Sequence, residues 1–125
     1  MNELRHAITA ARSGLRSGPD GEIIAEFCFA ESFPGFAGHF PGYPLLPAVV
    51  QVLIAQTLIE EHVETPLSLT EVGAAKFFEQ LRPQTPITVV CSERRPLPAA
   101  RWDVQLSAAG APAATFRLKL RPEEG

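Results

Sequence analysis

The chain has 125 residues, the length of one ordinary domain. With 46% hydrophobic and 20% charged residues, its composition is globular rather than disordered. Two cysteines exclude a disulfide-rich scaffold, and no cysteine or histidine lies at zinc-ligand spacing, so we expect neither metal nor cofactor. The longest apolar-dominated run, 48–59, is interrupted by Gln51, Gln56 and Thr57 and is far shorter than the roughly 20 residues of a membrane-spanning helix.

Charge is unevenly distributed along the chain. The net charge of −3 argues against a nonspecific nucleic-acid-binding protein. Residues 1–75 carry three basic and nine acidic side chains, a net of −6, whereas residues 76–121 carry eight and three, a net of +5. An acidic partner could therefore dock on the C-terminal half, although charged side chains at a protein surface more often serve only to keep that surface hydrated. The N-terminus lacks the basic-then-apolar order of a secretory signal, so we expect a cytoplasmic protein.

The first 30 residues predict at least one strand. Segment 1–16 allows two interpretations, because its apolar residues fall at helical spacing but a first strand also fits. The spaced residues are Leu4, Ile8, Ala11 and Leu15. A turn at 17–21 follows, rich in glycine and proline. Segment 22–30 then alternates with period two, which predicts a strand. Its inward residues are Ile23, Ala25, Phe27 and Phe29.

Segment 33–47 holds four prolines and three glycines, which exclude a regular element, and its aromatic residues predict a loop that packs down on the core. From Pro47 the sequence is apolar nearly all round, which predicts a buried helix that runs to about Val63. Pro66 stops it. Acidic residues near its end have the wrong sign for the helix dipole, so we expect them to be exposed. They are Glu60, Glu61 and Glu64.

The remaining sequence predicts four strands. They are centred on 67–78, on 87–91, on the alternating Trp102, Val104 and Leu106, and on the alternating Phe116, Leu118 and Leu120. Gly110 marks a hairpin between the last two. Cys28 and Cys91 are interpreted as small strand hydrophobes. The order is a strand, one helix and four strands, so we expect sheet to wrap the helix on most sides, because nothing else in the chain could cover it.

The motif Gly38-His39-Phe40-Pro41-Gly42-Tyr43-Pro44-Leu45-Leu46-Pro47-Ala48-Val49 resembles that of the 3-hydroxyacyl-[acyl-carrier-protein] dehydratases. Their pattern is G-H-F-P-G-x-P-x-x-P-G-V, and only Ala48 departs from it. Segments 75–77 and 81–83 resemble the same family more weakly. The sequence of residues 46–51 is more similar to that of a branch of the family found in aryl-polyene and related lipid pathways.

The resemblance implies an α+β hotdog fold over the whole of 1–125, a curved antiparallel sheet wrapped around one long buried helix. It also implies a dimer, because hotdog proteins pair their sheets and form two acyl tunnels at the interface. The partner is expected to be a second copy or a related hotdog subunit. The substrate would be a thioester of acyl-carrier protein or coenzyme A. No nucleic acid is expected as a partner.

The implied chemistry removes water from a 3-hydroxyacyl thioester. The family uses the motif histidine as base, which is His39 here, and a Glu or Asp 14 positions later as acid. Leu53 occupies that position, so the acid is absent. Gln51 or Gln56 could hold a water or the substrate hydroxyl, but an amide is no general acid. The carboxylate could instead come from a different subunit.

Other site residues follow from the same motif. The Ala48 N–H would polarise the thioester carbonyl at the start of the helix, and the Leu45 carbonyl would orient the histidine. Val49, Leu53 and Ile54 would line the acyl tunnel. Tyr43 would lie near its mouth, and Phe40 and Gly42 complete the predicted substrate-binding residues. Basic residues that could receive the acidic carrier are Lys76, Arg94, Arg95 and Arg101.

Three functions remain open at this point. The first is a dehydratase-like lyase with a degenerate acid position. The second is an inactive subunit that binds acyl chains or completes a heterodimer. The third is an acyl thioesterase, which Leu53 also disfavours because hydrolysis on this fold needs a carboxylate or a water-positioning group on the helix.

Overall fold

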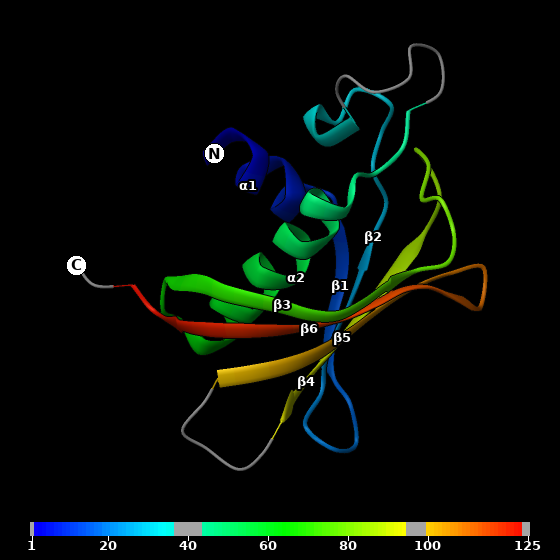
Figure 1. Cartoon of the computed structure of the whole chain (residues 1–125). Coiled ribbons are helices and arrows are strands. Elements are labelled where there is room, and N and C mark those ends of the chain that lie inside the picture. The colour runs from blue at the N-terminus through cyan, green and yellow to red at the C-terminus, as the bar shows by residue number, and fades with distance from the viewer. Residues whose placement is uncertain (1, 37–43, 95–99, 124–125) are drawn as a thin grey trace.

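The computed structural model describes residues 2–36, 44–94 and 100–123, and its six strands form one antiparallel sheet that curves around a helix (Figure 1). The elements are α1 (Asn2–Ala10), β1 (Arg12–Ser17), β2 (Ile23–Phe27), the short 3-10 helix η1 (Pro34–Phe36), α2 (Ala48–Val63), β3 (Leu67–Phe77), β4 (Ile87–Arg94), β5 (Ala100–Ala108) and β6 (Ala111–Pro122). The strand order is β1-β2-β4-β5-β6-β3. The predicted hotdog architecture is confirmed, and β3 forms an edge of the sheet.

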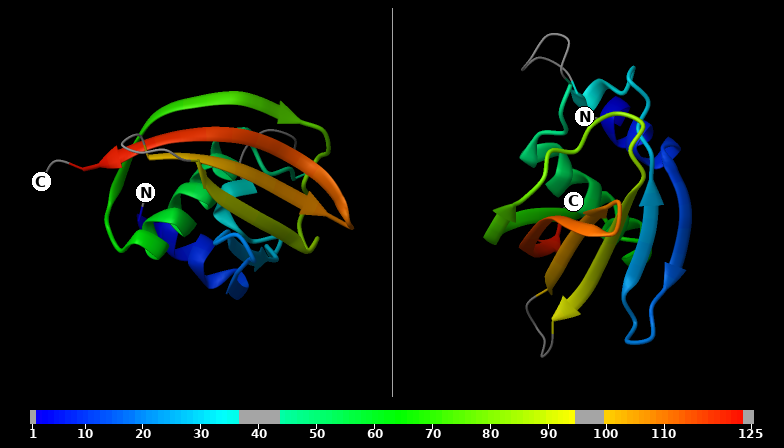
Figure 2. Two further views of the ribbon diagram at one scale, coloured as in Figure 1. Left: turned by 90° about the horizontal axis from the view of Figure 1, so that it is seen from below. Right: turned by 90° about the vertical axis from the view of Figure 1, so that its right-hand side faces the viewer.

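Helix α2 forms the centre of the core. Its middle is buried on nearly every side, as its uniformly apolar sequence predicts. Pro47 is the N-cap rather than the first helical residue, so the helix begins one position later than expected. The helix ends where Glu64 adopts a left-handed conformation, with φ of 56°, and its N–H bonds the Glu60 carbonyl. In Figure 2 the sheet arches over this helix along its length.

Both interpretations of the first 16 residues are partly right, because α1 is followed directly by β1. The sheet wraps α2 on most sides, as expected, but the expectation that nothing else in the chain could cover this helix is wrong. Helix α1 packs against α2, and its Ile8 is fully buried in the core. This nine-residue helix has one apolar face. That face packs on the side of α2 that the sheet leaves open.

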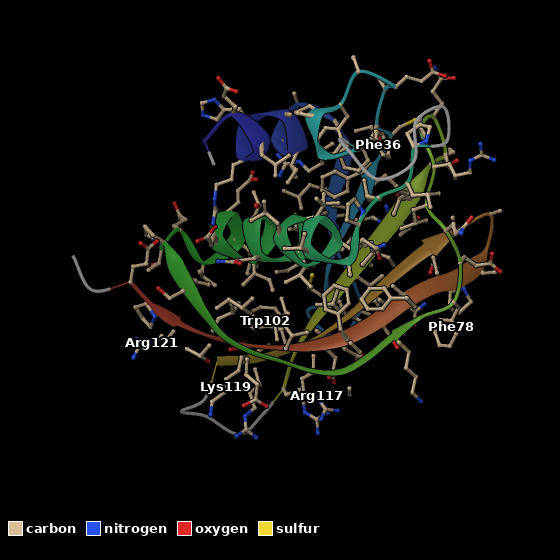
Figure 3. The ribbon with its side chains drawn as sticks, turned by 45° about the horizontal axis from the view of Figure 1, so that its top comes forward. Phe36, Phe78, Trp102, Arg117, Lys119 and Arg121 are labelled. Carbon is tan, nitrogen blue, oxygen red and sulfur yellow. The ribbon has the colours of Figure 1, made fainter. Side chains whose placement is uncertain are left out.

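The predicted alternation in the C-terminal strands is confirmed. Trp102 of β5 is buried against the core, whereas Arg117 and Lys119 of β6 point to the outer side of the sheet (Figure 3). A tight turn joins β5 to β6, as predicted. Ala109 and Gly110 there have φ of 54° and 79°, as a two-residue hairpin turn with the twist of the strands requires.

The aromatic residues of the loop after β2 pack inward, as predicted for the described part. The Phe33 ring lies 4.3 Å from that of Phe29 and 5.5 Å from that of Phe36, centroid to centroid. All three side chains are buried. This cluster anchors the chain immediately before the motif segment.

The two cysteines occupy different environments. Cys91 of β4 is buried, as predicted, and burial raises the pKa of its thiol to about 12. Cys28 is exposed, so its interpretation as a small strand hydrophobe is wrong. It lies one residue beyond β2, on the outer side of the period-two alternation.

Among the described residues, no helix is both long and apolar enough to cross a bilayer. Across those same residues, no three His, Cys, Asp or Glu side chains gather in a group that could hold a metal ion.

Candidate active site at the start of helix α2

Half of the predicted site lies outside the described residues. His39, Phe40, Gly42 and Tyr43 all belong to segment 37–43. Their roles stay predictions. The described half consists of Pro44 onward and the first turns of α2.

Within the described part of the chain, two N–H groups at the start of α2 have no hydrogen-bond partner. The Pro47 carbonyl accepts hydrogen bonds from the N–H groups of Val50 and Gln51, at 3.0 and 3.1 Å. The N–H groups of Ala48 and Val49 precede the first intrahelical bonds, and no described residue caps them. Both residues are exposed, and the first turn carries no acidic side chain. No described side chain therefore neutralises the positive end of the helix dipole, which favours an oxygen atom that gains negative charge.

The chain that enters α2 is held on both sides at Leu46. Its N–H donates to the Leu81 carbonyl at 2.8 Å, and its carbonyl accepts from Gln51 Nε2 at 3.0 Å. Leu45, the predicted orienting residue, directly precedes it and is half-buried. Gln51 is buried, and its Oε1 has no hydrogen-bond partner among the described residues. These contacts fix the direction in which the helix N-terminus points.

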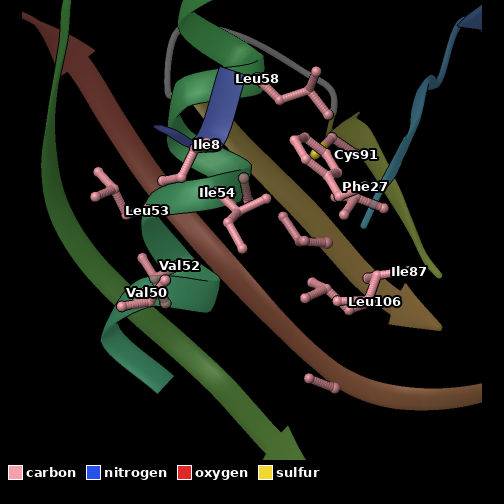
Figure 4. Close-up of a cluster of buried hydrophobic side chains, with 14 of the residues drawn as sticks. Ile8, Phe27, Val50, Val52, Leu53, Ile54, Leu58, Ile87, Cys91 and Leu106 are labelled. Carbon is pink, nitrogen blue, oxygen red and sulfur yellow. The ribbon is translucent and has the colours of Figure 1, made fainter. Parts of the chain in front are cut away.

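The three predicted tunnel residues do not share one surface. Val49 is 74% exposed, Leu53 lies one turn further along the same side at 8%, and Ile54 is completely buried. Figure 4 shows Leu53 and Ile54 leaving α2 in different directions, Ile54 toward the central strands. Val49 and Leu53 could face a ligand or a second subunit, whereas Ile54 belongs to the core of this chain.

The carboxylates of α2 are remote from position 53 and already engaged. Glu60 pairs with Arg5, and its Oε2 accepts a hydrogen bond from the Leu67 N–H at 2.7 Å. Glu61 pairs with Arg12. The expectation that these acids are exposed is wrong for Glu60, whose side chain is only 12% exposed, because α1 and the start of β3 close over it. Neither carboxylate is free to protonate a leaving group near Leu53.

The two buried amides of α2 engage different segments. Gln56 Nε2 donates to the Leu67 carbonyl at 3.0 Å, at the start of β3, whereas Gln51 bonds to the chain before the helix. Each amide therefore holds a backbone segment in place. These contacts agree with the prediction that the two amides form no common polar patch.

Three of the four predicted carrier-binding residues lie on the outer side of the sheet. Arg94 is bound to Asp103 at 3.2 Å, while Arg101 and Lys76 are exposed on β5 and β3. Arg95 lies outside the described residues. None of the three described positions adjoins the start of α2 in sequence or register, so they form a separate surface.

The β3 edge carries an apolar surface that the local sequence pattern does not predict. Large exposed hydrophobic side chains gather on β3 and immediately after it, at Leu69, Val72, Phe77 and Phe78. Period-two alternation predicts that such residues face the core, and only the strand order reveals that β3 lies beyond the cover of α2. An uncovered edge strand with apolar residues suits pairing with another chain.

Several solved structures share this fold. The dehydratase heterocomplex ApeI:P from Xenorhabdus doucetiae superposes with a TM-score of 0.76 at 18% identity, over 87% of this chain and 95% of that one. A mutant of the thioesterase PA1618 from Pseudomonas aeruginosa gives 0.62 at 22% identity, over 87% and 81%. The putative thioesterase yhdA from Lactococcus lactis gives 0.71 at 8%, over 99% and 100%.

No curated protein matches the sequence of this chain. A family model described as ApeI dehydratase does match it, over residues 16–115, which includes the motif segment, α2 and most of the sheet. The chain thus belongs to the ApeI-like dehydratase family.

Proposed function

We propose that this chain is the base-bearing subunit of a 3-hydroxyacyl-thioester dehydratase, with His39 as base and its acid supplied by another subunit. The observation that carries the proposal is the contrast at α2. The open helix start survives, whereas position 53 holds an apolar side chain and both helix carboxylates are engaged elsewhere. The family assignment supports dehydration as the reaction class.

The proposed reaction divides between two groups. His39 removes the proton from C2 of the substrate, and the electron pair moves into the thioester carbonyl. The N–H groups at the start of α2, led by that of Ala48, stabilise the negative oxygen. The C3–O bond then breaks, and the departing hydroxide takes a proton from a carboxylic acid and leaves as water.

The acid cannot come from Leu53. Loss of one acid–base partner costs about 10²–10⁴-fold in rate, so the isolated chain should eliminate water poorly. A related subunit with a carboxylate at the matching helix position would complete the site. The similar ApeI:P structure is a dehydratase heterocomplex, which supports this arrangement.

The apolar β3 edge is the proposed contact with that subunit. Two β3 edges placed antiparallel would remove the unpaired strand groups of both chains and cover Leu69 and Val72. A second copy of this chain could use the same surface when the related subunit is absent. That homodimer would contain two bases and no acid.

Thioesterase neighbours make hydrolysis the second candidate. Hydrolysis also needs a group that activates water, and the same apolar residue at position 53 opposes it. Dehydration would need only the missing general acid to be restored, and the family assignment supports it, so we favour dehydration over hydrolysis.

Restoring the acid tests the proposal. We expect Leu53→Glu to raise the rate of dehydration of a 3-hydroxyacyl pantetheine thioester at least about 100-fold. Leu53→Gln is the matched control, because it has the same length and polarity but no acidic proton. Adding His39→Ala to Leu53→Glu should remove the gained activity. Product can be followed by the absorbance of the new double bond conjugated to the thioester.

Circular dichroism must first establish that Leu53→Glu is folded, since a carboxyl at this buried position costs stability. A folded Leu53→Glu protein with no more activity than Leu53→Gln would contradict the missing-acid proposal. Equal activity with and without His39 would contradict the role of that residue.

A further inference from the structure

We propose that a hollow at the far end of α2 binds a small organic dication that also carries an oxygen acceptor. The hollow measures about 410 Å³ and lies between the β1–β2 turn, the last turn of α2, the end of β4 and the start of β5. Its lining includes Asp20, Glu22, His62, Ser92, Glu93 and Trp102, and we name it the acidic hollow. It lies about 20 Å along the helix from the candidate active site, so this inference does not rest on the proposed function.

The described part of the chain does not compensate the negative charge around the acidic hollow. Three carboxylates line it, those of Asp20, Glu22 and Glu93, and no described Lys or Arg does so. The arginines that form ion pairs within the described residues all bind other carboxylates. Like charges held around one hollow repel each other, so a cation bound among them would stabilise the folded chain.

The turn that carries two of these carboxylates is already ordered by hydrogen bonds. Glu22 Oε1 accepts a hydrogen bond from the Asp20 N–H at 2.8 Å, and the Gly18 N–H donates to the Glu22 carbonyl at 2.8 Å. The other carboxylate oxygen of Glu22 has no hydrogen-bond partner among the described residues. A ligand would therefore meet a carboxylate whose direction is fixed before binding.

Trp102 forms a buried wall of the acidic hollow, on the side of the sheet that faces α2 (Figure 3). It is only 4% exposed, yet no described residue accepts a hydrogen bond from its indole N–H. The His62 ring packs against it, with centroids 6.4 Å apart and 82° between the ring planes. Buried indole N–H groups normally have a partner, so an oxygen atom of a bound ligand would fill this role.

Glu93 and Trp102 place two different requirements next to each other. They lie directly opposite in the register of β4 and β5, and no hydrogen bond joins these two described residues. The carboxylate favours a cation, whereas the indole N–H favours a hydrogen-bond acceptor. A ligand that carries both groups meets both requirements, and an inorganic cation alone meets only the first.

The arrangement of the carboxylates favours an extended organic ligand over a metal ion. Among the described residues, no three His, Cys, Asp or Glu side chains gather closely enough to hold a metal ion. The three carboxylates are therefore spread around the hollow and suit two separated positive charges. Its volume falls within the roughly 300–1,000 Å³ of small-molecule sites. A hydroxylated diamine has the two ammonium groups and the oxygen atom that these walls require.

Binding can be measured without turnover, because Trp102 is the only tryptophan of the sequence and its fluorescence reports on the hollow. We would titrate the full chain with 1,3-diamino-2-propanol at constant ionic strength. Two comparison ligands each lack one group. They are 1,3-diaminopropane, without the hydroxyl, and 1-amino-2-propanol, without the second amine. Thermal unfolding with the same three ligands gives an independent readout.

The test variant combines Glu22→Gln with Glu93→Gln. A glutamine at position 22 keeps an oxygen that can accept the Asp20 N–H, so the turn retains its hydrogen bond. The matched control combines Glu31→Gln with Glu79→Gln, which also removes two negative charges, but from exposed residues that do not line the hollow.

We expect 1,3-diamino-2-propanol to change the fluorescence of the wild type saturably and to raise its unfolding temperature. Each comparison ligand should bind about tenfold more weakly, because one charge or one hydrogen bond is missing. The test variant should lose at least about tenfold in affinity, and the control should stay within about twofold. In thermal unfolding, Trp102→Phe should respond equally to the two diamines, since phenylalanine keeps an aromatic ring but has no N–H.

A wild-type protein whose fluorescence and unfolding temperature both ignore 1,3-diamino-2-propanol would overturn the proposal. Equal affinity of the wild type and the test variant would overturn it as well, because the carboxylates would then not hold the ligand. Circular dichroism establishes whether Trp102→Phe is folded. If it is not, the two diamines compared on the wild type still decide the role of the indole N–H, and equal affinity for both would contradict that role.

Discussion

Leu53 occupies the position at which the related dehydratases have their catalytic acid, so it decides what the isolated chain can do. The motif before it is nearly complete, so the sequence alone predicts a base, an oxyanion-binding helix start and a missing acid. The structure adds that neither carboxylate of α2 is free to replace the missing acid, because Glu60 and Glu61 are paired with arginines. A sequence cannot show that a glutamate is engaged, since the contact with Arg5 joins residues 55 positions apart.

The two cysteines give a residue-scale prediction. We expect one thiol per folded chain to react rapidly with a disulfide reagent and two to react in guanidinium, because Cys28 is exposed and Cys91 is buried. The Cys28→Ser variant should show no fast reaction when folded. Two rapidly reacting thiols in the native protein would contradict the burial of Cys91.

The buried thiol also affects stability at alkaline pH. Its pKa is raised to about 12 when folded, whereas the unfolded thiol ionises near 9. The unfolded state therefore loses its proton first. As the pH rises from about 9 to about 12, the free energy of unfolding should fall by at most about 1.4 kcal/mol per pH unit. The Cys91→Val variant should lack this pH dependence.

At the scale of elements, Glu60 joins three of them. It lies on α2, pairs with Arg5 of α1 and accepts a hydrogen bond from the first residue of β3. We expect Glu60→Gln to lower the free energy of unfolding by about 1–3 kcal/mol, because a charge-assisted bond and a buried contact are weakened together. Chemical denaturation measures the change.

Glu61→Gln is the control for that substitution. Its exposed pair with Arg12 contributes less than about 1 kcal/mol, so this variant should stay close to wild type. Equal losses in the two variants would contradict the linking role of Glu60.

Elements with a clear period or composition were predictable, and so was the strand β3, predicted at 67–78 and observed as Leu67–Phe77, whereas the short N-terminal elements were not. Helix α2 follows directly from its composition and ends at the predicted Val63, and strands β2, β5 and β6 contain the alternating residues that predicted them. The first 16 residues gave mixed signals because they hold a helix and a strand with one residue between them. The position of β3 at the edge depends on strand order, which no local pattern encodes.

At the scale of the whole molecule, the apolar β3 edge and the exposed helix start lead to the same expectation. Both need a second chain, one to cover hydrophobic surface and the other to complete the chemistry. We expect the purified chain to be a dimer in sedimentation equilibrium, and Val72→Lys, at a position 40% exposed, to make it monomeric.

Gln105→Lys, on the exposed outer face of β5, adds the same charge away from that edge and should leave the dimer intact. A wild-type chain that is monomeric at concentrations of about 100 µM, or a dimer that survives Val72→Lys, would contradict pairing through β3.

The most direct test of the account is solvent deuterium exchange at C2 of a 3-hydroxyacyl pantetheine thioester, measured by mass spectrometry with the chain alone. A base without its acid should exchange the C2 proton while forming little unsaturated product, and His39→Ala should abolish exchange. Rapid elimination of water by the chain alone, or exchange that persists without His39, would contradict a half-site that awaits its acid from another subunit.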